Sequence, residues 1–192
     1  MGRPAGPPRG GLTERAGCGW IMAITITAAR RVDDPEALSG LLREYLDSVL
    51  DTFRMEAGLA METDDLVRAT MGNIGAYLPP AGRLFLARDD AQALVGTIFL
   101  RRIRPDTAEI KRLYVRPEAR GSGLGRRLSE VAIAEARAMG MRSILIDTSI
   151  WLTAAQALYR SMGFHEIARY PESENDISLD PYLVYMELRL DA

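Results

Sequence analysis

The sequence predicts a single α/β domain with a mixed central β-sheet that carries helices on both of its faces. Three observations support this prediction. Segments with strand and helix periodicity alternate along the chain, one apolar run near residue 145 shows no alternation, and glycines separate a strand from a helix. The 192 residues, of which 47% are hydrophobic and 26% charged, are enough for one ordinary hydrophobic core.

The first 21 residues differ in composition from the rest of the chain. They are rich in Gly, Pro and Arg, and patterned sequence begins at Met22, which suggests Met22 as the true start. We expect residues 1–21 to be a disordered extension and residues 22–192 to form the domain. A faint likeness to a signal peptide here is outweighed, because cleavage would remove the first strand of the core.

The elements of the first half follow from periodicity and capping residues. Alternation of isoleucine and threonine predicts a strand over residues 23–30. Asp34 and Pro35 form a helix start, and the apolar positions after them keep helical spacing. Those positions are Leu38, Leu41, Leu42, Tyr45, Leu46, Val49, Leu50 and Phe53.

A second helix is predicted over residues 62–77, where it stops before two prolines. Three strand-like runs follow, at residues 83–88, 93–103 and 107–115. A short polar connection between the first two of these runs suits a hairpin.

The second half continues with a helix that ends near Gly140 and a strand over residues 143–147. This strand has no polar face, so we expect it to be central, and to be parallel to the strand at 107–115. A helix over residues 151–163 has Trp151, Ala154, Ala155, Leu158 and Met162 on one predicted apolar stripe. Two closing strands are predicted over residues 164–170 and 182–190.

The segment RPEARGSGLGRRL, Arg116–Leu128, places glycines where a strand ends and a helix begins. A helix N-terminus exposes unpaired N–H groups, and glycines allow a ligand to approach the backbone closely. Nearby arginines add charge-assisted contacts, so the segment predicts a phosphate site. A dinucleotide fingerprint would need glycine at position 126, which is arginine, and a P-loop would need Gly-Lys-Ser/Thr.

Two motifs give a specific resemblance. RGSGLG, at residues 120–125, is similar to the R/Q-x-x-G-x-G/A motif of the GCN5-related N-acetyltransferase (GNAT) family, and it follows a Leu-Tyr-Val strand as in that family. AAQALYRSMGF, at residues 154–164, resembles the second signature of the family. The order of elements over about residues 23–190 also resembles that fold.

The resemblance implies that acetyl-CoA is the cosubstrate, with its pyrophosphate on the amides of residues 121–126. It also implies that the pantetheine arm lies in a splay between the strands at 107–115 and 143–147. One departure is Leu152, where many relatives carry an asparagine that helps to hold the arm. The implied cofactor-binding residues are Leu113, Tyr114, Val115, Arg120, Gly121, Ser122, Gly123, Leu124, Gly125 and Arg126.

The same resemblance gives two catalytic candidates. Tyr159 occupies the position of a tyrosine that protonates the leaving thiolate, although a helix tyrosine can also serve only in packing. Glu109 lies on the strand before the glycine loop, where several relatives carry a general base, although it could instead pair with Lys111 or Arg112. The main-chain N–H of Val115 is a candidate for stabilising the oxyanion.

Composition bounds the remaining function classes. The single cysteine, Cys18, and single histidine, His165, argue against an acyl-enzyme and against a Cys/His metal site. We therefore expect direct attack by a primary amine in a ternary complex, with no metal. A net charge of −2 and the lack of a long apolar run lead us to expect a cytoplasmic protein that binds neither nucleic acid nor membranes.

The acceptor is the least constrained part of the prediction. The loop PESENDISLDP, residues 171–181, is acidic, which would suit a cationic small-molecule or peptide amine. Many relatives dimerise, so a homodimer is possible. The alternative function is a non-catalytic module that uses the same fold to bind and sense acyl-CoA.

Overall fold

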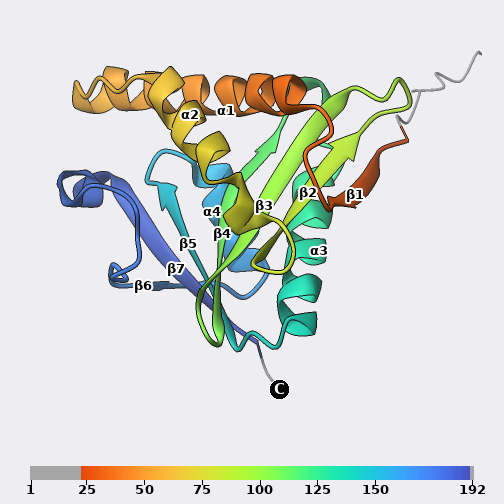
Figure 1. Cartoon of the computed structure of the whole chain (residues 1–192). Coiled ribbons are helices and arrows are strands. Elements are labelled where there is room, and N and C mark those ends of the chain that lie inside the picture. Colours follow the sequence, from red (N-terminus) through yellow and green to blue (C-terminus); the bar gives the residue numbers. More distant parts are fainter. Residues whose placement is uncertain (1–22, 191–192) are drawn as a thin grey trace, which may run out of the picture.

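The computed structural model describes residues 23–190, which form a seven-stranded sheet with helices on both faces (Figure 1). The predicted α/β class is confirmed. The predicted extension, residues 1–21, and the suggested start at Met22 lie outside the described residues.

The predicted elements are present, most with small changes in their bounds, although the strand predicted over 164–170 covers only His165–Ile167. In chain order they are β1 (Thr25–Ala29), α1 (Pro35–Ala57), α2 (Thr63–Gly72), the 3-10 turn η1 (Ile74–Tyr77), β2 (Gly82–Arg88), β3 (Leu94–Arg104), β4 (Thr107–Val115), η2 (Pro117–Ala119), α3 (Leu124–Ala138), β5 (Ser143–Ser149), α4 (Thr153–Ser161), β6 (His165–Ile167), η3 (Ile177–Tyr182) and β7 (Leu183–Arg189).

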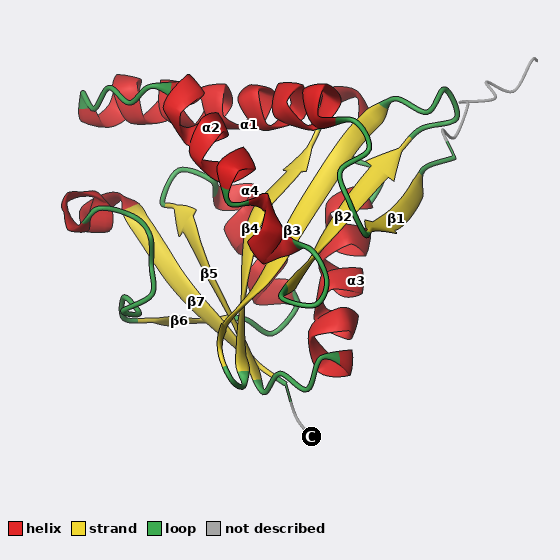
Figure 2. Ribbon diagram, in the orientation of Figure 1, coloured by secondary structure: helices red, strands yellow, loops and turns green. Residues whose placement is uncertain are grey.

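The strand order in the sheet is β1-β2-β3-β4-β5-β7-β6. All neighbouring strands are antiparallel except β4 and β5, which are parallel and joined through α3, as predicted. The β4–β5 pairing covers only Thr107–Glu109 against Ser143–Leu145, although both strands continue beyond it. Figure 2 shows the two strands meeting at one end and separating toward the other, which leaves an opening in the sheet.

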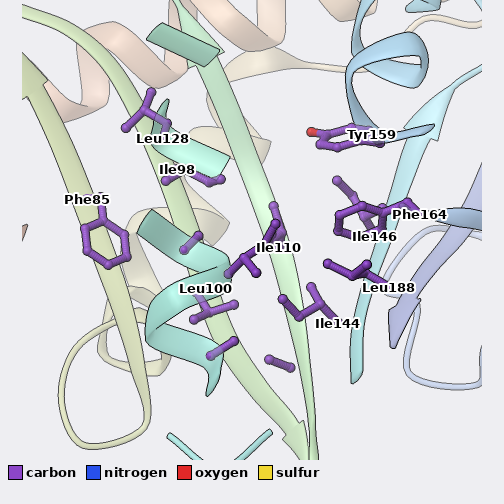
Figure 3. Close-up of a cluster of buried hydrophobic side chains, with 14 of the residues drawn as sticks. Phe85, Ile98, Leu100, Ile110, Leu128, Ile144, Ile146, Tyr159, Phe164 and Leu188 are labelled. Carbon is purple, nitrogen blue, oxygen red and sulfur yellow. The ribbon is translucent and has the colours of Figure 1, made fainter. Parts of the chain in front are cut away.

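Each face of the sheet has its own hydrophobic cluster. Side chains from α1, α2 and η1 cover β2, β3 and β4 on one face. Side chains from α3 and α4 cover the other face, where Ile98, Ile110 and Leu128 are fully or almost fully buried (Figure 3). The helices therefore cover the sheet on both faces, and the opening between β4 and β5 lies between these two packed layers.

Local sequence explains the long helix. The Asp34 carboxylate accepts a hydrogen bond from the Ala37 N–H at 2.9 Å, Pro35 occupies the first turn, and Gly58 ends the helix at a φ of 66°. The leucines of the predicted apolar stripe are buried against the sheet. The prediction of an amphipathic helix here is confirmed.

Two local predictions need correction. The helix predicted over 62–77 divides into α2 and η1, because Gly72, Asn73 and Gly75 are poor helix formers. The stripe predicted on the last helix is also wrong in part. Ala154 is exposed, whereas Gln156 is buried, because its side-chain amide donates hydrogen bonds to two carbonyls at the end of β5.

Candidate active site

The opening between β4 and β5 contains a small cavity of about 40 Å³. Residues 110–113 of β4 form one wall, residues 146–148 of β5 form another, and α4 closes it with Leu152, Ala155 and Tyr159. Beyond Glu109 and Leu145 the facing edges of the two strands have no ladder partner in each other, so backbone groups are free to bind an extended ligand. This is the place where the splay was predicted.

A β-bulge in β4 shapes one side of the opening. Thr97 pairs with Tyr114 and Phe99 with Lys111, so β4 contains one residue more than β3 over this stretch. Arg112 carries the bulge in a left-handed conformation, with a φ of 53°. The bulge interrupts the alternation of side chains, which explains why both Lys111 and Arg112 line cavities of the cleft.

The glycine loop follows β4 directly and leads into α3. Gly121 and Gly123 have φ values of 75° and 77°, a region that glycine adopts without strain. A Cβ at either glycine would meet no atom within 4 Å, so space lies open above the loop. In the described part of the chain no side chain caps the N-terminus of α3, which leaves its first N–H groups for an anion. These features fit a pyrophosphate.

The arginines of the loop are held in different ways. Arg120 donates from Nε to the carbonyl of Val115 at 3.0 Å, and its guanidinium lies 5.9 Å from the ring centroid of Tyr114. Arg126 donates to the Ser161 hydroxyl at 2.6 Å, which links α3 to α4. Both arginines are exposed beside the loop, so they can contribute positive charge to a phosphate ligand.

The other predicted cofactor-binding residues have mixed surroundings. Leu113 lines the opening, and the Ser122 hydroxyl donates to the Ala119 carbonyl at 2.7 Å, which tightens the loop. Leu124 is buried in the core, and a Cβ at Gly125 would lie 3.6 Å from Leu158. Tyr114 packs instead on Tyr45 of α1, at 5.7 Å between ring centroids, and Val115 packs against the core.

Tyr159 lies in the opening itself. Its ring is 96% buried and packs on Phe164 at 5.5 Å, while its hydroxyl is directed toward β4 (Figure 3). Burial raises the pKa of the Tyr159 phenol well above its ordinary value. The phenol therefore stays protonated at neutral pH and can donate a proton or a hydrogen bond to a group in the opening.

Glu109 lies beneath the cleft and does not line the cavities described here. Its side chain is fully buried, and one carboxylate oxygen accepts from Arg101 at 2.6 Å. The other oxygen accepts from the Tyr170 hydroxyl at 2.5 Å and lies 3.1 Å from the Lys111 ammonium. The pairing with Lys111 that the sequence left open is therefore present, whereas Arg112 is not a partner of Glu109.

The same network reaches the cleft through Asp147. The Asp147 carboxylate lies 2.5 Å from the Lys111 ammonium and 3.0 Å from the Tyr170 hydroxyl, so Tyr170 bridges two carboxylates. Burial is the largest influence on Asp147 and opposes its ionisation. The charge of Lys111 and the hydrogen bonds from Lys111, Asn175 and Tyr170 together outweigh it and lower the pKa of Asp147 below its ordinary value. Sequence reasoning missed Asp147, although an acidic residue ending the apolar run SILID was a usable signal.

Two larger cavities adjoin the opening on the side of α1 and α2. One of about 290 Å³ shares Tyr45, Arg112 and Asp147 with the opening. The other, of about 380 Å³, shares Arg112 and Glu174 with the first. The three cavities thus form one cleft, which runs from Tyr159 to the loop between β6 and β7.

The acidic loop does not present the unbalanced negative charge that its sequence suggests. Arginines from β3 and from the loop's own start neutralise three of its four acidic side chains, and the fourth caps a turn within the loop. The pairs are Arg104 with Glu172, Arg101 with Glu174, Arg169 with Asp180, and the Asp176 carboxylate with the Ser178 N–H. Charge attraction by this loop therefore gives little reason to expect a polycationic acceptor.

Leu152, which replaces the asparagine of many relatives, occupies the N-cap position of α4 without a side-chain cap. It lines both the opening and the cavity of about 290 Å³. An apolar side chain thus stands where many relatives carry the asparagine that contacts the cosubstrate.

No helix among residues 23–190 is long and apolar enough to cross a membrane.

Comparisons with known proteins agree with this geometry. The profile of the acetyltransferase (GNAT) family matches residues 43–164. An uncharacterised N-acetyltransferase of Schizosaccharomyces pombe is 33% identical over 168 residues, which cover 87% of this chain and 95% of that protein. A GNAT-family acetyltransferase from Staphylococcus aureus superposes with a TM-score of 0.69 at 25% identity, covering 88% of this chain and 100% of that one. A putative acetyltransferase from Salmonella typhimurium, solved with its cofactor acetyl-CoA, superposes with a TM-score of 0.61 at 23% identity, covering 88% of this chain and 95% of that one.

Proposed function

Since this chain belongs to the GNAT family of acetyltransferases, we propose that it moves an acetyl group from acetyl-CoA to a primary amine by direct attack in a ternary complex. The observation that carries the proposal is the continuous cleft. The glycine loop at the end of β4 leaves N–H groups of α3 for an anion, the phenol of Tyr159 lies in the opening, and the adjoining cavity is large enough for an acceptor.

The donor half would hold acetyl-CoA, which supplies the acetyl thioester. The N–H groups of residues 121–126 would bind the pyrophosphate, with Arg120 and Arg126 adding charge at its rim. The free backbone groups of β4 at residues 113–115 would bind the pantetheine arm between β4 and β5. Leu152 would contribute only apolar contact there.

The transfer needs a neutral amine and a proton for the departing sulfur. A bond forms between the amine nitrogen and the acyl carbon, and the carbon–sulfur bond breaks with its electron pair going to sulfur. The nitrogen loses a proton to water, which replaces the proton that the sulfur takes from its acid. We propose that the Tyr159 hydroxyl protonates the sulfur, because Tyr159 lines the opening between β4 and β5 in which the thioester would lie.

The amine end of the reaction is assigned to Asp147 and its network. Asp147 lines the opening and the adjoining cavity, whereas the predicted base Glu109 is fully buried. We therefore propose that Asp147 contacts the acceptor nitrogen, and that Glu109 acts through Tyr170 and Lys111 as a positioning residue. The direct role of Glu109 as base has no support from its burial.

A thiol-release assay over a panel of amines, with acetyl-CoA as donor, tests the proposed function. Release of one equivalent of CoA for each acetylated amine is expected for at least one acceptor class. Tight binding of acetyl-CoA without turnover on any amine would overturn it in favour of the acyl-CoA-binding module.

A further inference from the structure

Arg112 differs from the other basic side chains around the cleft. Arg101 pairs with Glu109 and Glu174, and Lys111 pairs with Glu109 and Asp147. Within residues 23–190, Arg112 makes no ion pair, although it lies next to Lys111 in the sequence. Arg112 lies on the bulge of β4, where the regular alternation of side chains is interrupted. Its side chain therefore points into the cleft.

The hydrogen bonds of Arg112 are also incomplete. One Nη donates to the Thr70 hydroxyl on α2 at 3.2 Å, while the buried Nε has no partner in the described part of the chain. A guanidinium carries five N–H donors in one plane, and a buried donor without a partner is costly. The residue is therefore suited to a planar anionic group that would take up the free donors.

Arg112 stands where all three cavities meet. It lines the opening beside Tyr159 and both larger cavities, and Thr70 holds it on the side of α2, away from the glycine loop. An anion on Arg112 would thus be separate from the pyrophosphate of the cosubstrate. Such an anion would belong to the molecule in the acceptor half of the cleft.

The charges of the cleft have a polarity that fits a zwitterion. The network of Arg101, Lys111, Glu109, Glu174 and Asp147 contains two cations and three carboxylates, so it has one negative charge in excess. Among the described residues that line the cavity of about 290 Å³, Arg112 is the cation, whereas Asp147, Glu174 and Asp176 are the carboxylates. An ammonium or amine group near Asp147 and a carboxylate near Arg112 would match both charges.

One wall of that cavity is apolar, while polar residues such as Ser149, Asn175 and Asp176 also line the cavity. This wall consists of hydrophobic side chains, which have no polar group to offer a ligand. They come from α1, from α2 and from the connection between these two helices. They are Leu46, Val49, Leu50, Phe53, Met61 and Leu66. A volume of about 290 Å³ suits a small molecule with one apolar side chain.

We propose that the acceptor is a free amino acid with an apolar side chain, and that Arg112 binds its α-carboxylate while Asp147 faces its amino group. This inference rests on the proposed acetyl transfer and names the substrate class of the same site. The amino nitrogen takes the acetyl group and loses a proton, and CoA leaves as the thiol, so the carboxylate is unchanged by the reaction.

The test compares L-leucine, L-methionine and L-phenylalanine with their α-amides and with the decarboxylated amines. For at least one of the three we expect kcat/KM for the acid to exceed that for the amide by about 10- to 100-fold, the scale of one charge-assisted pair. The amide has the less basic amino group, hence more of the reactive neutral amine, so a preference for the acid is not explained by amine reactivity. Equal rates for acid and amide in all three pairs would overturn the proposal.

In the variant Arg112→Gln the ratio of kcat/KM for the acid to kcat/KM for the amide should fall to about one. Arg112→Lys should keep part of the preference for the acid. Arg68→Gln is the matched control, because Arg68 is exposed on α2 and outside the cleft lining. An unchanged ratio in Arg112→Gln would contradict the role of Arg112. If this variant is unstable, the acid–amide comparison on the wild-type protein still decides the substrate class.

A binding measurement separates this inference from the proposed function. Calorimetry with CoA and N-acetyl-L-leucine needs no turnover, and binding should weaken by about tenfold or more in Arg112→Gln. If binding depends on Arg112 but no amine is acetylated, the proposed acetyl transfer is wrong and the carboxylate site is retained. If amines are acetylated but their carboxylate has no effect on the rate, only the proposed carboxylate site is wrong.

Discussion

The two halves of the proposed active site are built from different materials. The proposed donor end consists of backbone N–H groups of one contiguous loop, with left-handed glycines and open space above them. The proposed acceptor end consists of side chains from α1, α2, β4, β5 and the loop after β6. A site made of backbone can be encoded in a short motif, whereas a site made of side chains exists only after distant segments have packed.

The two ends also differ in how their charges are balanced. The donor end offers N–H groups at an exposed helix terminus, which can be blocked with little effect on the core. The acceptor end rests on Glu109, Lys111 and Asp147, which are mostly buried and share partners. Changes at the donor end should therefore affect binding, and changes beneath the acceptor end should affect stability.

The largest effect is expected from Glu109→Gln, which would test that contrast directly. Removing this carboxylate leaves Arg101 and Lys111 without one of their partners in the interior, at a cost of about 3–5 kcal/mol. The melting temperature should fall by roughly 10 °C. The matched variant Glu172→Gln breaks a pair with Arg104 that is more than one third exposed, and should cost less than about 1 kcal/mol. Similar losses in both variants would contradict the importance of the buried network.

The next effect is expected at the donor end, from Gly123→Val. A side chain in the left-handed region costs about 1–2 kcal/mol, and here it would also occupy the space above the loop. We expect the Kd for acetyl-CoA, measured by calorimetry, to rise by about 100-fold, the loss of two or so phosphate hydrogen bonds.

Gly140→Val is the control for this change, because Gly140 has a φ of 76°, equally open surroundings, and lies after the other end of α3. Both variants should lose similar stability, and only the first should lose acetyl-CoA affinity. An unaltered Kd in Gly123→Val would count against the loop as the phosphate site.

A smaller effect is expected from Tyr159→Phe, at the junction of the two ends. Loss of the hydroxyl should lower kcat by about tenfold or more with little change in the KM for acetyl-CoA, because the proton is needed only as sulfur leaves. Tyr182→Phe removes a hydroxyl outside the cleft lining and should leave kcat unchanged. If kcat is retained in Tyr159→Phe, the ring serves only in packing on Phe164.

The smallest effect is a difference in pH dependence, seen with Asp147→Asn. The folded-state pKa of Asp147 lies below its ordinary value of 3.8, so its ionised form stabilises the fold above that pH. This contribution is lost as the pH falls through the lowered pKa. At neutral pH the variant should have a lower free energy of unfolding than the wild-type protein. The difference between the two free energies, measured by urea titration, should narrow below pH 3.8. A gap that stays constant with pH would show that Lys111 does not stabilise this carboxylate.

Much of the fold was accessible from periodicity alone. The strand at 107–115 and the helix after Asp34 were predicted at or near their observed bounds, since both depend on local pattern and capping. The break between α2 and η1, at residues 72–75, was missed. The glycines there lower helix propensity locally, and the helical periodicity of the longer segment hides this effect. The burial of Gln156 was missed because its partners are carbonyls of another element.

The site was accessible to a lesser degree. The glycine loop and Tyr159 lie within motifs, so the place of the loop directly after β4 and that of Tyr159 in the opening followed from the order of elements. Glu109 was expected at the cleft, but the pairing of β4 with β3 and β5 buries it beneath Arg101 and Tyr170. The charge of the acidic loop was misjudged, because its arginine partners lie about 70 residues away or at its own start.

The sequence by itself determined the class of fold and the kind of donor, because both are written in contiguous patterns: strand and helix periods, and glycines before a helix. Only the tertiary structure decided which charges remain unbalanced. Arg112 stands beside Lys111 in the chain and is indistinguishable from it by type. The bulge in β4 gives Lys111 two carboxylate partners and leaves Arg112 facing the cleft with none among residues 23–190. The Coulomb energy of a charge depends on its neighbours in space, and the sequence does not name them.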